Sequence, residues 1–193
     1  PLRRQRQMCI RDRRYFAKTT LPWMSIGYET QVPPMNILTF YNAIANNGVM
    51  VRPKFVKAAV KDGEVVKEYP TEVINPKICS DHTLTQIREI LRKVVSQGLA
   101  KPAGSKQFSV SGKTGTAQNR GHDHSVFMGF APMNDPKIAI AVYVENGGWG
   151  ADYGVPLGAL MMEQYLNGKL SPESEKLAEM YQQRHIGYVT ADR

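Results

Sequence analysis

The sequence predicts an α+β fold in which helices flank an antiparallel sheet. Three segments of strand length, residues 108–118, 124–132 and 137–145, follow one another with short polar connections. Strands joined in this way pair as an antiparallel meander. Segments with helical periodicity precede and follow this meander. The composition agrees with one globular core, because 42% of the residues are hydrophobic and 22% are charged.

The elements before the meander have clear start and stop signals. A helix is predicted over residues 33–48, since proline is tolerated in a first turn and Gly48 can end a helix. A hairpin is predicted next, with strands 54–60 and 64–69 joined at Asp62-Gly63. The inward face of the first helix is expected to hold Met35, Leu38, Tyr41, Ile44 and Ala45.

Two longer helices and a short one complete the prediction. Ser80 is a good N-cap for a helix that runs to Gln97. A second helix is predicted over Gly154–Asn167, and the polar tail is expected to be helical around residues 172–183. The predicted inward residues are Leu84, Ile87, Leu91, Val94 and Val95 in the first helix, and Leu157, Leu160, Met161 and Tyr165 in the second.

The basic charge is concentrated at one end of the chain. The net charge is +8, and residues 1–14 hold six arginines and one acidic residue. This run resembles a translated adapter sequence, so we interpret it as a non-native or disordered tail and expect no nucleic-acid partner. The predicted organisation is therefore a tail over 1–14, a domain over 15–168 and a polar tail over 169–193.

The most informative stretch is Ser111–Gln118, which contains Lys-Thr-Gly on a predicted strand. This triplet is one of three motifs of serine acyl-transferases related to penicillin-binding proteins and β-lactamases. A phosphate-binding P-loop is excluded, because the first glycine of that motif would have to stand where Gln107 is. A surface lysine on a hairpin edge is the plain structural alternative.

Further segments in the right order carry a resemblance to a known family. Ser25-Ile26-Gly27 with the following Val32-Pro33-Pro34, then Asn42–Gly48, Val51-Arg52-Pro53, the Lys-Thr-Gly strand and Phe127–Pro132 occur in family order. Over residues 15–168 the chain resembles the C-terminal part of a class B penicillin-binding protein transpeptidase domain. The resemblance implies a partial penicillin-binding protein fold, of the kind shared with β-lactamases.

The resemblance also implies which residues would act. Lys113 and the Thr114 hydroxyl would hold the carboxylate of a D-Ala-D-Ala stem peptide or of a β-lactam. Gly115 would let ligand backbone approach the strand, and the Thr116 N–H would supply half of an oxyanion hole. Gln118 would line the outer groove. Lys113 and Thr116 are thus the expected catalytic residues present in this chain.

Two family motifs do not occur in the sequence. No serine is followed by lysine three positions later, and none is followed by asparagine two positions later. The S-x-x-K serine is the family's nucleophile, so the chain is expected to be a C-terminal fragment that is inactive by itself. The alternative function is a penicillin-recognising sensor or binding module without turnover.

The two sides of the motif resemble different members of the family. Residues up to about Gln118 are most similar to division-type enzymes. Those from Asn119 through Gly147–Gly150 to the Ser171–Ser174 tail are more similar to elongation-type enzymes. A chimera of the two types is therefore an alternative to a single gene. In a chimera, we would expect imperfect packing between the two parts.

The remaining expectations concern partners and location. The resemblance implies the cell envelope, on the periplasmic face of the plasma membrane, with an anchor outside this sequence and a glycosyltransferase as partner. No cofactor is expected. His122-Asp123-His124 is interpreted as a polar loop and not as a metal site, because its spacing is poor for zinc ligands. Cys79 is expected to be a small packed residue.

Overall fold

The computed structural model describes residues 18–27, 32–118 and 121–184, and the predicted tail over residues 1–14 lies outside this part of the chain. The chain divides into two units, Pro1–Pro33 and Pro34–Arg193. The first unit contains helix α2 (Thr20–Ser25), which the sequence patterns did not predict. None of the helices in the described ranges is both long and apolar enough for a bilayer crossing. The predicted domain limits remain predictions.

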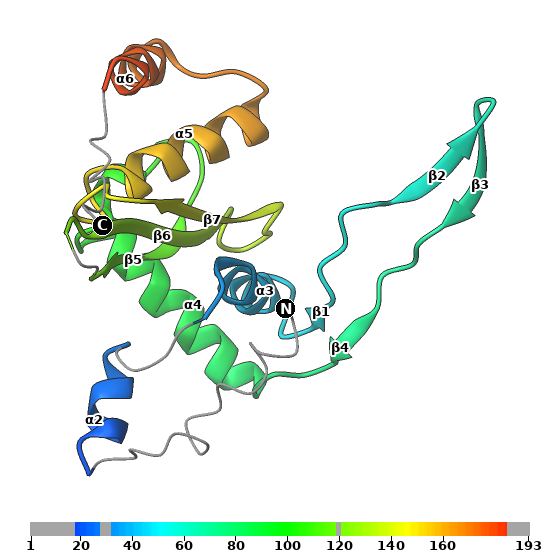
Figure 1. Ribbon diagram of the computed structural model, residues 1–193, viewed down its shortest axis with the longest axis horizontal. Helices are drawn as coiled ribbons and strands as arrows, with labels where there is room; N and C mark the ends of the chain where they lie inside the picture. Colours follow the sequence, from blue (N-terminus) through cyan, green and yellow to red (C-terminus); the bar gives the residue numbers. More distant parts are fainter. Residues whose placement is uncertain (1–17, 28–31, 119–120, 185–193) are drawn as a thin grey trace, which may run out of the picture. The chain divides into compact units, whose positions relative to one another are not determined.

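The second unit contains the sheet and the helices that cover it (Figure 1). Strands β5, β6 and β7 pair in that order, and both pairs are antiparallel. The predicted α+β meander is therefore confirmed. The elements are α3 (Pro34–Ala45), β1 (Met50–Val51), β2 (Ala58–Lys61), β3 (Glu64–Glu68), β4 (Val73–Asn75), α4 (Asp81–Ser96), the 3-10 turn η2 (Lys101–Ala103), β5 (Ser111–Ala117), β6 (His124–Ala131), β7 (Ile138–Val144), α5 (Gly154–Asn167) and α6 (Pro172–Gln182).

Both faces of the sheet are covered, because β6 alternates large side chains between them. Phe127 is fully buried with Val155 and Met162 of α5 on one face. Phe130 is fully buried on the other face, in a cluster with Ile44 of α3 and Leu91 of α4. The result is a layer of helix on each side of the strands (Figure 1). Cys79 packs against the second cluster, as expected.

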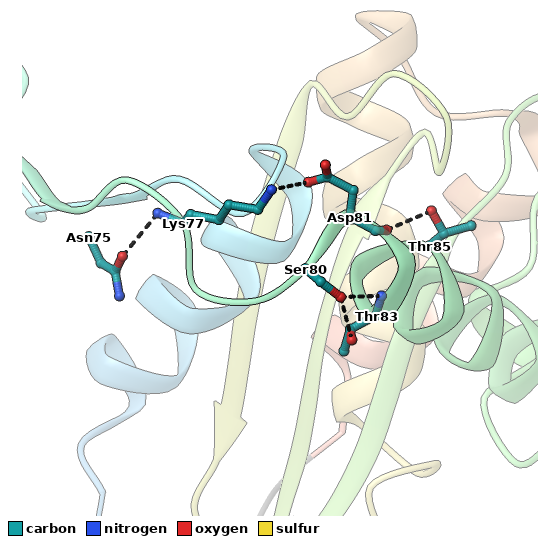
Figure 2. Close-up of polar contacts among 6 residues, drawn as sticks. All are labelled: Asn75, Lys77, Ser80, Asp81, Thr83 and Thr85. Carbon is teal, nitrogen blue, oxygen red and sulfur yellow. Dashed lines mark hydrogen bonds and ion pairs between the residues drawn. The ribbon is translucent and has the colours of Figure 1, made fainter.

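Helix α4 begins where the sequence predicts. The Ser80 Oγ accepts a hydrogen bond from the Thr83 N–H at 3.1 Å, and Lys77 forms an ion pair of 3.0 Å with Asp81 (Figure 2). The cap satisfies one of the donors that the first turn of a helix leaves unpaired. The predicted stripe also faces inward, since Leu84, Leu91 and Val95 are buried.

Arg88 of α4 holds the end of α3. Its guanidinium donates hydrogen bonds to the carbonyl oxygens of Ile44 at 2.7 and 2.9 Å and of Ala45 at 2.8 Å. These carbonyls lie in the last turn of α3, where they lack partners within the helix. A cation at this end also complements the helix dipole. The two helices that cover one face of the sheet are thereby fastened together.

Some details of the sequence prediction were wrong. Met35, expected on the inward face of α3, is exposed. Residues 108–110 precede β5 and are not in the strand. The Ser109 carbonyl there accepts a hydrogen bond from the Met133 N–H at 2.9 Å.

In α5, Met161 and Tyr165 face solvent with 52% and 62% exposure. Leu160 is buried and Leu157 packs against the core, as expected. The further buried residues Val155, Gly158 and Met162 were not predicted. Apolar residues occur on most faces of this helix, so periodicity alone could not predict which face is buried.

The predicted hairpin is confirmed, but its first strand is shorter. Strand β2 begins at Ala58 and pairs with β3 around Asp62 and Gly63, whose φ angles are 53° and 86°. Such angles suit the tight turns that Asp-Gly favours. The hairpin extends away from the sheet (Figure 1). Its base is closed by β1 and β4, a short irregular pair that was not predicted, and by a bidentate Arg52–Glu72 ion pair.

The packing is continuous across residue 118, where a chimera would join. Strand β5, before this point, pairs with β6, after it, along all seven of its residues. One hydrophobic cluster also combines Val95 and Val110 with Phe127 and Val155. Among the residues that the structure describes, the expected imperfect packing between the two parts is therefore not found.

Candidate functional site: an open strand edge with a tethered loop

Strand β5 carries the predicted site on an edge of the sheet. Within the part of the chain that the structure describes, β5 pairs with β6 and has no strand on its other side. In an antiparallel pair every second residue turns its N–H and C=O away from the partner. About half of the backbone groups of Ser111–Ala117 therefore face an edge that an extended ligand could join.

Lys113 and Thr114 come together at this edge. Neighbouring side chains on a strand leave on opposite faces. The long lysine side chain nevertheless returns to the edge, so that its Nζ donates to the Thr114 carbonyl at 2.6 Å and lies 3.5 Å from the Thr114 Oγ1. Lys113 is exposed and forms no ion pair with any described residue. An exposed ammonium group beside a hydroxyl is suited to binding a carboxylate.

Gly115 and Thr116 lie against the loop between β7 and α5, which we call the β7–α5 loop (residues 145–153). The Gly150 N–H donates to the Thr116 Oγ1 at 3.3 Å. A Cβ atom added to Gly150 would lie 2.6 Å from the Gly115 carbonyl oxygen, so this close approach requires glycine. The Thr116 side chain is thus used to hold a loop, whereas the Lys113 and Thr114 side chains gather at the edge.

Ser125 of β6 also forms hydrogen bonds that hold the β7–α5 loop in place. Its buried hydroxyl donates to the Trp149 carbonyl at 2.8 Å and accepts from the Gly154 N–H at 2.9 Å. Sequence reasoning missed both Ser125 and Gly150 as residues of the site. The only local signal was the run Gly147-Gly148-Trp149-Gly150, because clustered glycines indicate close backbone approaches.

The remaining predicted residues lie at the margin of the site. Gln118 is exposed and stands one residue beyond the end of β5. His124 is the first residue of β6, and its Nδ1 accepts a hydrogen bond from the Asn146 N–H at 3.0 Å. The Asp123 carbonyl accepts another from the Gly148 N–H at 2.8 Å. The segment interpreted as a polar loop therefore supports the start of the β7–α5 loop.

Comparison with known proteins identifies the family of the chain. The family model of the penicillin-binding protein transpeptidase domain matches residues 13–163. The peptidoglycan D,D-transpeptidase MrdA of Haemophilus influenzae is 29% identical, with 82% of this chain and 27% of that protein covered. Stage V sporulation protein D of Bacillus subtilis is 28% identical, with 82% and 26% covered. The chain thus spans about a quarter of the length of these relatives.

Solved structures give the same result. The D,D-transpeptidase domain of a peptidoglycan glycosyltransferase from Eggerthella lenta is 28% identical and superposes with a TM-score of 0.64, covering 80% of this chain and 37% of that one. An imipenem acyl-enzyme complex of penicillin-binding protein A from M. tuberculosis is 25% identical, with a TM-score of 0.65 and coverages of 76% and 34%. The resemblance drawn from motif order is confirmed: the chain belongs to the penicillin-binding protein transpeptidase family.

Proposed function

We propose that this chain supplies the ligand-binding strand of a penicillin-binding peptidoglycan D,D-transpeptidase. The observation that carries the proposal is the Lys113 ammonium group beside the Thr114 hydroxyl on the unpaired edge of β5. A D-Ala-D-Ala stem peptide and a β-lactam both present a carboxylate next to an acyl group. A peptide laid along this edge gains backbone hydrogen bonds, and its carboxylate gains a charge-assisted one.

Each site residue then has a distinct part in acyl transfer. Lys113 and Thr114 bind the carboxylate. Gly115, which also lies against Gly150, admits the ligand backbone beside the strand. The Thr116 N–H donates to the oxyanion that forms when the acyl carbon is attacked, and one such donor contributes on the order of 3–4 kcal/mol to catalysis. Gln118 lines the outer groove. The Thr116 hydroxyl, which already accepts from Gly150, fixes the strand against the loop.

The nucleophile of the proposed reaction is not among these residues. In this family it is the serine of S-x-x-K, a pattern that does not occur in this sequence. The chain by itself is therefore proposed to bind ligands without becoming acylated. Incubation with a fluorescent penicillin followed by denaturing electrophoresis tests this point, because a covalent label on the chain would contradict it.

The proposed setting is the cell envelope, at the periplasmic face of the plasma membrane, where a glycosyltransferase would supply the glycan strands. The names of the relatives support this setting, since they include a peptidoglycan D,D-transpeptidase. The alternative is a penicillin sensor on the same fold. A longer protein that contains this chain would decide between them, because an enzyme turns over a D-Ala-D-Ala substrate and a sensor stays acylated.

Replacement of Lys113 tests the proposed binding of a ligand carboxylate by its ammonium group. Hydrogen bonds to charged groups contribute roughly 1.5–3 kcal/mol, so Lys113→Ala should weaken ligand engagement about ten- to a hundredfold. Lys113→Arg should recover part of it, since it restores the charge and not the geometry. In this chain the measurement is the NMR shift of β5 amides on titration with N-acetyl-D-Ala-D-Ala. In a longer protein with the serine, it is second-order acylation by a β-lactam.

The control for this experiment is Lys101→Ala, which removes an exposed lysine from η2 and not from the sheet. Equal binding in wild type and Lys113→Ala would contradict the assigned role. A collapse of the melting temperature in Lys113→Ala would instead make Lys113 a structural residue.

A further inference from the structure

The C-terminal helix α6 is attached to the domain through polar contacts at both ends. None of its residues is buried. At its start the Glu163 carboxylate of α5 accepts hydrogen bonds from the Ser171 N–H at 2.9 Å and from the Ser174 hydroxyl. Burial raises the pKa of Glu163, but these hydrogen bonds outweigh it and hold the pKa below its usual value. The start of α6 is thus fixed to α5.

The end of α6 contacts the β7–α5 loop. The Tyr181 hydroxyl donates to the Asp152 carbonyl at 2.6 Å. The rings of Tyr153 and Tyr181 meet edge to face, with centroids 5.5 Å apart. The Arg184 guanidinium lies 4.8 Å from the Tyr181 ring and 5.6 Å from the Tyr153 ring. Such aromatic and cation–π contacts each add a modest attraction at an exposed surface.

The contacted residue, Asp152, belongs to a chain of contacts that reaches β5. The Asp152 N–H donates to the Trp149 carbonyl at 2.9 Å, and the Asp152 Oδ2 accepts from the Trp149 N–H at 3.3 Å. Gly150, which follows Trp149, donates its N–H to the Thr116 Oγ1 and lies against Gly115. A tight turn therefore connects Asp152, which Tyr181 contacts, with Gly150, which contacts Thr116.

We propose that α6 is a latch for the β7–α5 loop and that Tyr181 is a positioning residue for the ligand-binding strand. The Tyr181 hydroxyl fixes Asp152 through its carbonyl, and the Ser125 hydroxyl fixes Trp149 through its carbonyl. With both residues fixed, Gly150 between them has one position against Thr116. The consequence for ligand binding rests on the proposed function of β5. The latch itself does not, because it concerns contacts within this chain.

The test compares matched tyrosine variants of the full chain. Tyr181→Phe removes the hydroxyl donor alone, and Tyr181→Ala also removes the ring. Tyr165→Phe is the control, because it makes the same chemical change on the exposed face of α5. Hydrogen exchange of residues 146–153 is followed by mass spectrometry beside a thermal melt, since local opening raises exchange without changing global stability.

We expect hydrogen exchange in residues 146–153 to rise severalfold in Tyr181→Phe and further in Tyr181→Ala. Exchange in Tyr165→Phe should equal that of wild type. The melting midpoint of Tyr181→Phe should also equal that of wild type. Unchanged exchange in both Tyr181 variants overturns the latch. A uniform rise over all peptides with a lowered midpoint overturns it too, because Tyr181 would then stabilise the whole domain. A rise confined to residues 146–153 supports it.

Titration with N-acetyl-D-Ala-D-Ala separates this inference from the proposed function. If Tyr181 positions the strand, Tyr181→Phe weakens binding severalfold while Lys113→Ala weakens it more. Binding that is insensitive to Lys113→Ala refutes the proposed function and leaves the exchange result standing. Binding that responds to Lys113→Ala and not to Tyr181→Phe, together with unchanged exchange, refutes the latch alone.

Discussion

The central sheet and the β2–β3 hairpin are both antiparallel and rich in apolar residues, yet only the sheet is buried. Strand β6 has six buried residues of eight, whereas all five residues of β3 are exposed, Val65 and Val66 among them. At the base of the hairpin Phe55 is 87% exposed. The sheet is therefore stabilised by packing of side chains against helices, and the hairpin by its turn and its ladder. Strand composition alone does not distinguish the two.

The largest difference should appear when an apolar side chain is truncated in each of the two regions. Phe127→Ala removes a fully buried ring from the cluster between the sheet and α5, and should lower the free energy of unfolding by about 3–5 kcal/mol. Val66→Ala in the hairpin should change it by less than about 0.5 kcal/mol. Urea unfolding measures both. Similar losses would mean that the hairpin is packed in solution.

The contact between α5 and the sheet leaves no room for a methyl group. A Cβ atom on Gly158 would lie 2.6 Å from the Phe127 Cδ1 and 3.1 Å from the Ile140 Cδ1. Gly158→Ala should therefore destabilise by roughly 1–3 kcal/mol through overpacking, although alanine is the better helix former. Met161→Ala on the exposed face of the same helix is the control. An unchanged melting midpoint in Gly158→Ala would show that α5 can shift.

The hairpin should instead depend on its turn. Gly63 has a φ of 86°, a conformation that costs residues other than glycine about 1–2 kcal/mol. We expect Gly63→Ala to raise hydrogen exchange across residues 58–68 severalfold, with no change in the global unfolding midpoint. Val65→Ala serves as the comparison and should have a smaller effect. If the two substitutions act equally, side-chain contacts matter in the hairpin as much as the turn does.

The smallest expected effect concerns a polar group inside the sheet. The Ser111 hydroxyl is fully buried and has no hydrogen-bond partner among the residues that the structure describes. An unpaired buried hydroxyl is unfavourable, so Ser111→Ala should leave stability unchanged or raise it by up to about 1 kcal/mol. Ser125→Ala should do the opposite, because the Ser125 hydroxyl has two partners. A loss of stability in Ser111→Ala would indicate a bound water at this hydroxyl.

Local signals predicted much of the fold. The Ser80 cap, the Asp-Gly turn and the periodicity of α4 each depend on a few neighbouring residues. The missed features depend on distant partners. The β1–β4 pair joins segments more than 20 residues apart, and the buried face of α5 is selected by Phe127 and Ile140 of the sheet.

The candidate site shows the same limit. The Lys113-Thr114-Gly115 motif was recognisable because its residue types and order are fixed in one strand. Gly150 bonds to Thr116 of that strand across 34 residues of sequence. Ser125 and Tyr181 bond to the β7–α5 loop that carries Gly150, across 24 and 29 residues. No period or motif records such contacts, so the structure was needed to find the residues that support the strand.

The unpaired edge of β5 has a consequence for solubility as well as for ligands. An open edge can accept a strand from a second copy of the protein, which is the first step of edge-to-edge aggregation. Two such edges would bring two Lys113 ammonium groups close together, and their repulsion opposes the pairing. Neutralising Lys113 removes this protection, so solutions of Lys113→Ala should associate at lower protein concentration than wild type. Light scattering would record the difference.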